Sequence, residues 1–184
     1  GCFVQRGDAA IVSPAIRAKM ALQNGADAVI LLPALWSVRD AEHFASGGVH
    51  LLTGLGCDAL SFGAETADLP LLQAAADALE SPDLPAVIQP HLSAGLPHPA
   101  ALSAAMAEVA PAAVRVLQSP NNTLGVCYLR ALRQLGASTD VYPIARASDY
   151  HASAIGDGFS SATAIRSAIL RGDWSSAYSA MPGS

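Results

Sequence analysis

Three hydroxyl side chains and an arginine gather at the start of a predicted helix. Ser160, Ser161 and Thr163 open the amphipathic segment "SSATAIRSAILRG", and Arg166 lies one helical turn beyond Ala162. A serine or threonine at an N-cap accepts a hydrogen bond from a free backbone N–H, which can explain one or two of these hydroxyls. Arg166 adds a planar, permanent charge at a helix end that already favours a phosphate. The combination of hydroxyls and guanidinium at this helix start therefore suits the polyphosphate of a nucleotide.

Further polar residues stand at other predicted helix starts and strand ends. Asn121 opens "SPNNTLG", either as a helix cap or as an amide that reads a ribose hydroxyl or a base edge. Gly63 follows the strand "LSF", and Arg146 follows the strand "VYPIA". Ligands of doubly wound sheets bind beyond the carboxyl ends of the strands. We therefore expect these residues to share one crevice with the start of the last helix.

Helix and strand patterns alternate and predict an α/β fold with a Rossmann-like, doubly wound parallel sheet. The expected strands cover residues 27–33, 58–63 and 139–146. The expected helices cover residues 13–25, 38–56 with an interruption at Gly47 and Gly48, 67–81, 99–110, 120–136 and 160–172. Residues 81–98 are rich in proline and predict an irregular connection.

Length and composition narrow the class of protein. The chain has 184 residues, of which 52% are hydrophobic and 14% charged, so we expect one domain over residues 1–184. The net charge is −5 and Lys19 is the only lysine, which excludes a broad basic surface for nucleic acid. Any RNA must then be held by a few arginines or by a part that is not present in this sequence.

The sequence gives little support for disulfides, a metal site or a membrane span. The three cysteines are widely spaced, which predicts neither a disulfide framework nor a zinc site and favours a reducing, cytoplasmic location. His43 and His50 have no third ligand nearby, so we expect no metal site. The longest apolar run, "AVILLPAL", is too short to span a bilayer.

Four ordered segments resemble the bacterial tRNA(Met) cytidine acetate ligase family, which is nucleotidyltransferase-like. They are "FVQRGDAAIVSPAIRAKMALQNGADAVILLP", "AEHFASGGVHLLTGLGCDALSFGAE", "SPNNTLGVCYLRAL" and "SSATAIRSAI". The resemblance implies an enzyme that uses ATP, with Mg²⁺, to activate acetate as acetyl-adenylate. The acetyl group then passes to N4 of the wobble cytidine of elongator tRNA(Met).

The resemblance also implies roles for individual residues. Gly63 of the "FG-x-E" turn, Asn121 of "PN-x-x-LG", and Arg146 with the adjoining Ala147 would contact ATP. The hydroxyls and the arginine of "SSATAIR" would contact its phosphates, with Thr163 and Arg166 as catalytic residues and Ser160 and Ser161 as nucleotide-binding residues.

The sequence also departs from the family pattern. Family members begin with a strand and a His-x-Gly-His loop that grips the phosphates and continue into a helical region, and we expect this chain to lack both. Leu31 stands where the family has glutamate. Two alternatives therefore stay open: a nucleotidyltransferase acting on a small phosphorylated metabolite, and an inactive nucleotide- or RNA-binding remnant.

Overall fold

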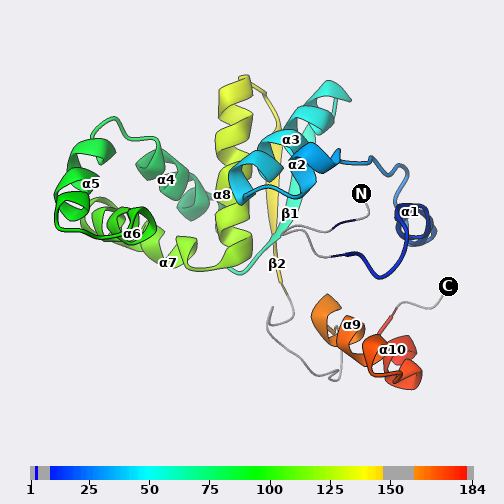
Figure 1. Cartoon of the computed structure of the whole chain (residues 1–184). Coiled ribbons are helices and arrows are strands. Elements are labelled where there is room, and N and C mark those ends of the chain that lie inside the picture. Colours follow the sequence, from blue (N-terminus) through cyan, green and yellow to red (C-terminus); the bar gives the residue numbers. More distant parts are fainter. Residues whose placement is uncertain (1–2, 4–8, 147–159, 182–184) are drawn as a thin grey trace. The chain divides into compact units, whose positions relative to one another are not determined.

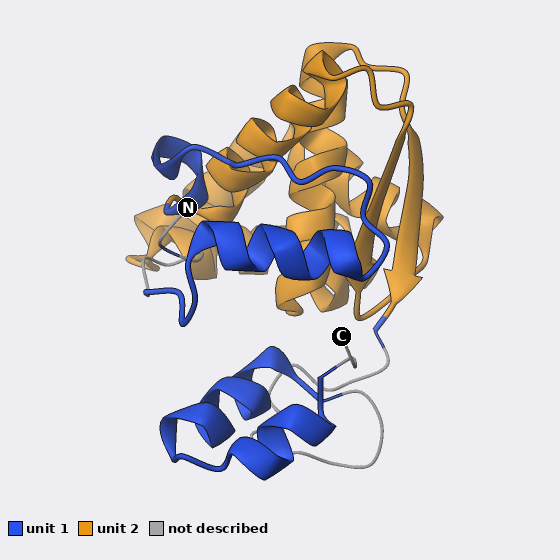
Figure 2. Cartoon of the chain, turned by 90° about the vertical axis from the view of Figure 1, so that its right-hand side faces the viewer, with its two compact units in different colours: residues 1–38, 146–184 blue, residues 39–145 orange. Residues whose placement is uncertain are grey.

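The computed structural model describes residues 3, 9–146 and 160–181. The chain comprises two compact units (Figure 2). Residues 39–145 form one unit, and residues 1–38 together with 146–184 form the other. The single domain expected from the length stays a prediction.

The unit of residues 39–145 contains a parallel two-stranded sheet. Strand β1 (Ala59–Ala64) pairs with strand β2 (Asp140–Ala145), in a register that runs from Ala59 opposite Asp140 to Ala64 opposite Ala145. Parallel neighbours need a long crossover connection, and here it consists of helices. The predicted α/β fold class, with a parallel sheet, is confirmed.

The same unit also contains helices. The first is α3 (Ala41–Gly54), and the crossover contains α4 (Leu69–Leu79), α5 (Leu84–Ser93), α6 (His98–Val109), α7 (Pro111–Leu117) and α8 (Pro120–Leu135). Helices α4 to α7 lie on one side of α8, whereas α3 and the two strands lie on the other (Figure 1).

Helix α8 contributes side chains to two apolar clusters, which fix its position relative to the neighbouring helices and the sheet. Val126 and Leu129 pack in a cluster with Leu72 and Met106, both of which are fully buried. One turn later, Leu132 packs with residues of α3 and β1. Burial of such side chains stabilises a fold by about 1.5–3 kcal/mol each. The middle and the last turn of α8 are therefore fixed against the neighbouring helices and the sheet.

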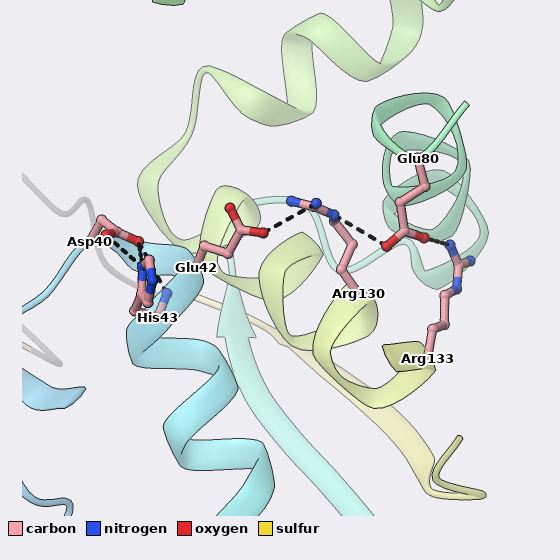
Figure 3. Close-up of polar contacts among 6 residues, drawn as sticks. All are labelled: Asp40, Glu42, His43, Glu80, Arg130 and Arg133. Atoms are coloured by element: carbon pink, nitrogen blue, oxygen red, sulfur yellow. Dashed lines mark hydrogen bonds and ion pairs between the residues drawn. The ribbon is translucent and has the colours of Figure 1, made fainter. Parts of the chain in front are cut away.

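Ion pairs fasten α8 to its neighbouring helices (Figure 3). Arg130 contacts Glu42 of α3 at 3.2 Å and Glu80, at the end of α4, at 3.3 Å. Arg133 contacts Glu80 at 3.1 Å and Asp77 of α4 at 2.7 Å. The carboxylate of Glu80 is shared by both arginines, which makes this a network, and a network gives more rigidity than isolated surface pairs.

The other unit contains α1 (Pro14–Gln23), α2 (Ala34–Ser37), α9 (Ala162–Leu170) and α10 (Trp174–Ser179). Helix α1 begins as predicted, since the Ser13 side chain accepts a hydrogen bond from Ile16 N. Helices α9 and α10 pack against each other through small side chains, and Ala168 and Ala177 are fully buried. None of the described helices is long and apolar enough to cross a bilayer.

The strand predicted at residues 27–33 is wrong. These residues have no regular secondary structure, and Val29, Ile30 and Leu31 are 44%, 47% and 61% exposed. An apolar run forms a buried strand only where neighbouring strands satisfy its backbone groups. Among the residues that the structure describes, none pairs with this segment.

Two helix predictions also need correction. The connection at residues 81–98 contains α5, because Pro85 lies in its first turn, where a missing N–H is tolerated. Pro90 lies inside α5, close to its end. Helix α3 continues through Gly47 and Gly48 without interruption. Gly47 is buried, so packing outweighs the low helix propensity of glycine.

Candidate nucleotide-binding site

Ser161 begins α9 as its N-cap. Its Oγ accepts a hydrogen bond from Ala164 N at 3.0 Å, and the residue is only 6% exposed. The capping interpretation is therefore confirmed for this hydroxyl. The Oγ of the preceding Ser160 is buried and has no hydrogen-bond partner in the described parts of the chain. A buried hydroxyl without a partner is costly, so Ser160 retains capacity to bind a further group.

Thr163 and Arg166 form a pair on the exposed face of the first turns of α9. The Arg166 Nη2 donates a hydrogen bond to Thr163 Oγ1 at 3.1 Å, and both residues are exposed. Residues three apart are neighbours on a helix surface, so this bond directs the guanidinium back toward the start of α9. Ser161, Thr163 and Arg166 are thus together at one helix end, as predicted.

A carboxylate from a distant segment binds the start of α8. Glu65 Oε1 accepts from the side-chain Nδ2 of Asn121 at 2.7 Å and from its backbone N at 3.3 Å. Glu65 Oε2 accepts from Asn122 N at 3.0 Å. Ser119 occupies the N-cap position, but its side chain makes no capping bond. Glu65 therefore supplies the cap for α8.

This arrangement lowers the pKa of Glu65. Partial burial raises the pKa, but the hydrogen bonds donated by Asn121 and Asn122 outweigh that effect, and the pKa lies below its ordinary value of 4.5. The positive end of the helix dipole favours the same ionised form. Glu65 is thus a carboxylate at neutral pH.

Asn122 lies beneath this contact and is completely buried. Its Oδ1 accepts a hydrogen bond from Thr66 N at 3.0 Å, which ties the turn after β1 to α8. Its Nδ2 has no partner within the described residues. Sequence reasoning singled out neither Glu65 nor Asn122, although the "FG-x-E" and "PNN" segments contain them.

Gly63 is the penultimate residue of β1, opposite Ile144 of β2. Its neighbour Phe62 lies directly against Gly125 of α8, where an added Cβ would come within 2.9 Å of the Phe62 Cζ. Gly125 therefore allows α8 to approach the end of β1 closely. Arg146 is exposed and directly follows β2, whose last residue pairs with the last residue of β1.

The predicted site residues fall into two groups, one in each unit. Gly63 and Asn121 lie in the same unit, joined through Glu65. Ser160, Ser161, Thr163 and Arg166 lie together in the other unit, to which Arg146 also belongs. Ala147 lies outside the described residues. The crevice expected to unite the two groups stays a prediction.

His43 takes part in local contacts at the start of α3 (Figure 3). Its Nδ1 lies 2.8 Å from Asp40 Oδ2, and Arg39 Nη2 lies 2.9 Å from its Nε2. Hydrogen bonds from the ring and the backbone of His43 lower the pKa of Asp40 from 3.8 to about 2. In the described ranges, no group of three or more His, Cys, Asp or Glu side chains could hold a metal ion.

Curated relatives align with 99% of this chain. A tRNA(Met) cytidine acetate ligase of Bacillus velezensis is 40% identical over 189 residues, which cover 99% of this chain and 46% of that protein. The ligase of the same name from Kosmotoga olearia is 38% identical over 192 residues, with 99% and 45% coverage. The chain thus spans about half the length of these curated relatives.

Solved structures agree with the sequence comparison. Thermotoga maritima TmcAL in its apo form superposes with a TM-score of 0.92 at 29% identity, covering 99% of this chain and 45% of that one. The same protein bound with alpha-thio ATP gives a TM-score of 0.88 at 30% identity, covering 99% and 44%. The model of the HIGH Nucleotidyl Transferase family matches residues 1–184. The chain therefore belongs to the HIGH nucleotidyl transferase family.

Proposed function

We propose that this chain forms the nucleotide-binding part of an ATP-dependent tRNA(Met) cytidine acetate ligase. The enzyme would activate acetate as acetyl-adenylate and transfer the acetyl group to N4 of the wobble cytidine of elongator tRNA(Met). The observation that carries this proposal is the exposed Thr163–Arg166 pair at the capped start of α9. The similarity to ligases of that name and to a structure bound with alpha-thio ATP supports it.

The proposed chemistry needs no covalent enzyme intermediate. A carboxylate oxygen of acetate attacks the α-phosphorus of ATP in line, and pyrophosphate leaves with the electrons of the broken P–O bond. The cytidine N4 amine then attacks the acetyl carbonyl, loses a proton, and releases AMP. Both steps depend mainly on positioning and on neutralising the negative charge that develops.

The residues of this chain would divide that task. Arg166, already oriented by Thr163, would neutralise charge on the phosphates, and the unsatisfied hydroxyl of Ser160 would donate to a phosphate oxygen. Asn121, Gly63 and Arg146, with the adjoining Ala147, would bind ATP. Mg²⁺ would be held largely by the phosphates themselves, as is usual for this ion. A substrate of this kind implies the cytoplasm as the location.

The test follows acetate-dependent exchange of pyrophosphate into ATP by the protein that carries this sequence. Arg166→Ala should lower the exchange rate about a hundredfold, because one charged contact to the transition state is lost. Arg171→Ala, which removes an exposed arginine at the other end of α9, serves as the control and should leave exchange unchanged.

Three outcomes would contradict the proposal. Full pyrophosphate exchange by Arg166→Ala would show that Arg166 at the start of α9 does not take part in the reaction. A dinucleotide product formed without tRNA would favour a nucleotidyltransferase acting on a phosphorylated metabolite. ATP binding without any exchange would identify a remnant that binds nucleotide but does not react.

A further inference from the structure

A pocket of about 470 Å³ opens beside the turn that follows β1, within the unit of residues 39–145. Its wall is mostly apolar, with one hydroxyl and one guanidinium. The lining residues are Thr66, Leu71, Pro111, Ala112, Arg115 and Val116. Pockets of about 300–1,000 Å³ suit ligands of nucleotide size. A two-carbon carboxylate such as acetate is much too small to fill this one.

The pocket adjoins the Glu65–Asn121 contact. Thr66 lines the pocket, follows Glu65 directly, and donates its N–H to Asn122 Oδ1 at 3.0 Å. On the opposite wall, the end of α7 is fixed to α8 because Thr123 Oγ1 donates to Leu117 O at 2.9 Å. The pocket therefore has a fixed position relative to Asn121.

Arg115 is the distinctive group of this pocket. Among the arginines of residues 39–145, Arg130 and Arg133 form ion pairs and Arg39 contacts His43. Arg115 makes no ion pair or hydrogen bond with any residue that the structure describes, and it is exposed. A guanidinium that no carboxylate neutralises is available to bind an anion bidentately.

We propose that this pocket binds one nucleotide of the RNA substrate, with the base against the apolar wall and its phosphate at Arg115. This inference rests on the proposed function, since it names where that substrate is held. Proteins that bind single-stranded nucleic acid hold the phosphates with basic groups and the bases on side-chain surfaces, which are usually aromatic and are aliphatic in this pocket. Because the chain carries a net charge of −5, any RNA that these 184 residues bind would contact local cations of this kind rather than a broad basic surface.

The first test measures the affinity of the protein for a fluorescent RNA hairpin with the anticodon stem-loop of elongator tRNA(Met). Arg115→Glu should weaken binding about tenfold and lower the slope of log K against log salt by about 1. The control is Lys19→Glu, which changes the net charge by the same amount at an exposed residue distant in the sequence. It should leave the affinity for the hairpin and the salt slope nearly unchanged. Equal losses in the two variants, or no RNA binding by the wild type, would overturn the inference.

A second variant tests the same pocket without removing the arginine. Ala112 is exposed and lies one turn before Arg115 on α7, so Ala112→Glu would pair with the guanidinium. An acidic residue in the first turn of a helix is well tolerated, so the fold should persist. RNA binding should fall as in Arg115→Glu, and wild-type affinity in this variant would count against the pocket.

The design separates this inference from the proposed function. ATP binding should be unchanged in Arg115→Glu and Ala112→Glu, and its loss would show that the pocket belongs to the ATP site instead. Competition by free cytidine monophosphate as effective as by the hairpin would assign the pocket to a free nucleotide and overturn the RNA assignment. RNA binding that depends on Arg115, in a protein without pyrophosphate exchange, would uphold the pocket and refute the ligase.

Discussion

The carboxylate of Glu65 lies 2.7 Å from the side-chain nitrogen of Asn121, although 56 residues separate them in the sequence. This contact joins the end of β1 to the start of α8. Those are the two segments in which Gly63 and Asn121 were predicted to meet ATP. The geometry of this half of the site therefore depends on a residue that need not touch the nucleotide.

Glu65→Gln should destabilise the protein by about 1 kcal/mol, because a neutral amide accepts hydrogen bonds less well and the residue is partly exposed to solvent. Asp58→Asn is the control and should have little effect, because this exposed carboxylate before β1 makes no side-chain hydrogen bond with any described residue. Urea unfolding of both variants measures the difference. If Glu65→Gln loses no more unfolding free energy than the control does, Glu65 does not act as the cap of α8.

The same contact predicts a pH dependence. The pKa of Glu65 is lower in the folded protein than its ordinary value of 4.5, so the stabilisation is fully present above 4.5 and is lost as the pH falls through the lowered pKa. Unfolding free energies measured from pH 7 to pH 3 should therefore decline more steeply in the wild type than in Glu65→Gln. Parallel profiles would show that this carboxylate does not contribute.

The two adjacent asparagines should behave differently on substitution. Asn121→Ala should weaken ATP binding about tenfold, as expected for one lost hydrogen bond, with a small change in stability. Asn122→Ala should instead destabilise the fold by about 1–3 kcal/mol, because the Thr66 N–H loses its acceptor. Calorimetry with ATP and thermal unfolding separate the two effects, and ATP binding that survives Asn121→Ala intact would remove Asn121 from the site.

Gly125→Ala should destabilise the protein by about 1–3 kcal/mol, because the new methyl group would displace the Phe62 ring, which also packs on Tyr128 at a centroid distance of 5.4 Å. Gly48→Ala is the matched control on α3. No atom lies within 4 Å of its added Cβ, so this variant should be stabilised by about 0.5–1 kcal/mol. Destabilisation of equal size in both would mean that the Phe62 contact is unimportant.

Ser161→Asp tests whether the start of α9 binds phosphate as well as being capped. Aspartate is as good an N-cap as serine, whereas alanine costs about 0.5–2 kcal/mol, so only Ser161→Ala should lower the melting temperature. Ser161→Asp should nevertheless weaken ATP binding, because it adds negative charge beside the phosphates. Ser13→Asp makes the same change at the cap of α1 and should leave ATP binding intact. Unchanged binding in Ser161→Asp would place the phosphates elsewhere.

Local signals explain which parts of the fold could be predicted from the sequence. Helix α8 begins at Pro120 and ends at Leu135, and its C-cap Gly136 has a left-handed φ of +61°, so both of its ends follow from residue type. The strand prediction for residues 27–33 was wrong because an apolar run indicates a preference for burial but does not indicate whether a neighbouring strand is present. Helix α5 was missed because its prolines indicated a loop.

The candidate site shows the same limit. The Ser161 cap and the Thr163–Arg166 pair depend on neighbours within one helical turn, and the sequence predicted both positions. Glu65 and Asn122 act through partners more than fifty residues away, and no local pattern reports such contacts.

Occupation of the start of α8 by Glu65 limits how a nucleotide can approach it. Helix N-termini commonly bind phosphates, yet here the backbone N–H groups of Asn121 and Asn122 already donate hydrogen bonds to the Glu65 carboxylate. A second anion would be repelled at this place. Any nucleotide that reaches Asn121 must therefore present an uncharged edge, such as its sugar or its base, and its triphosphate tail must point away from α8.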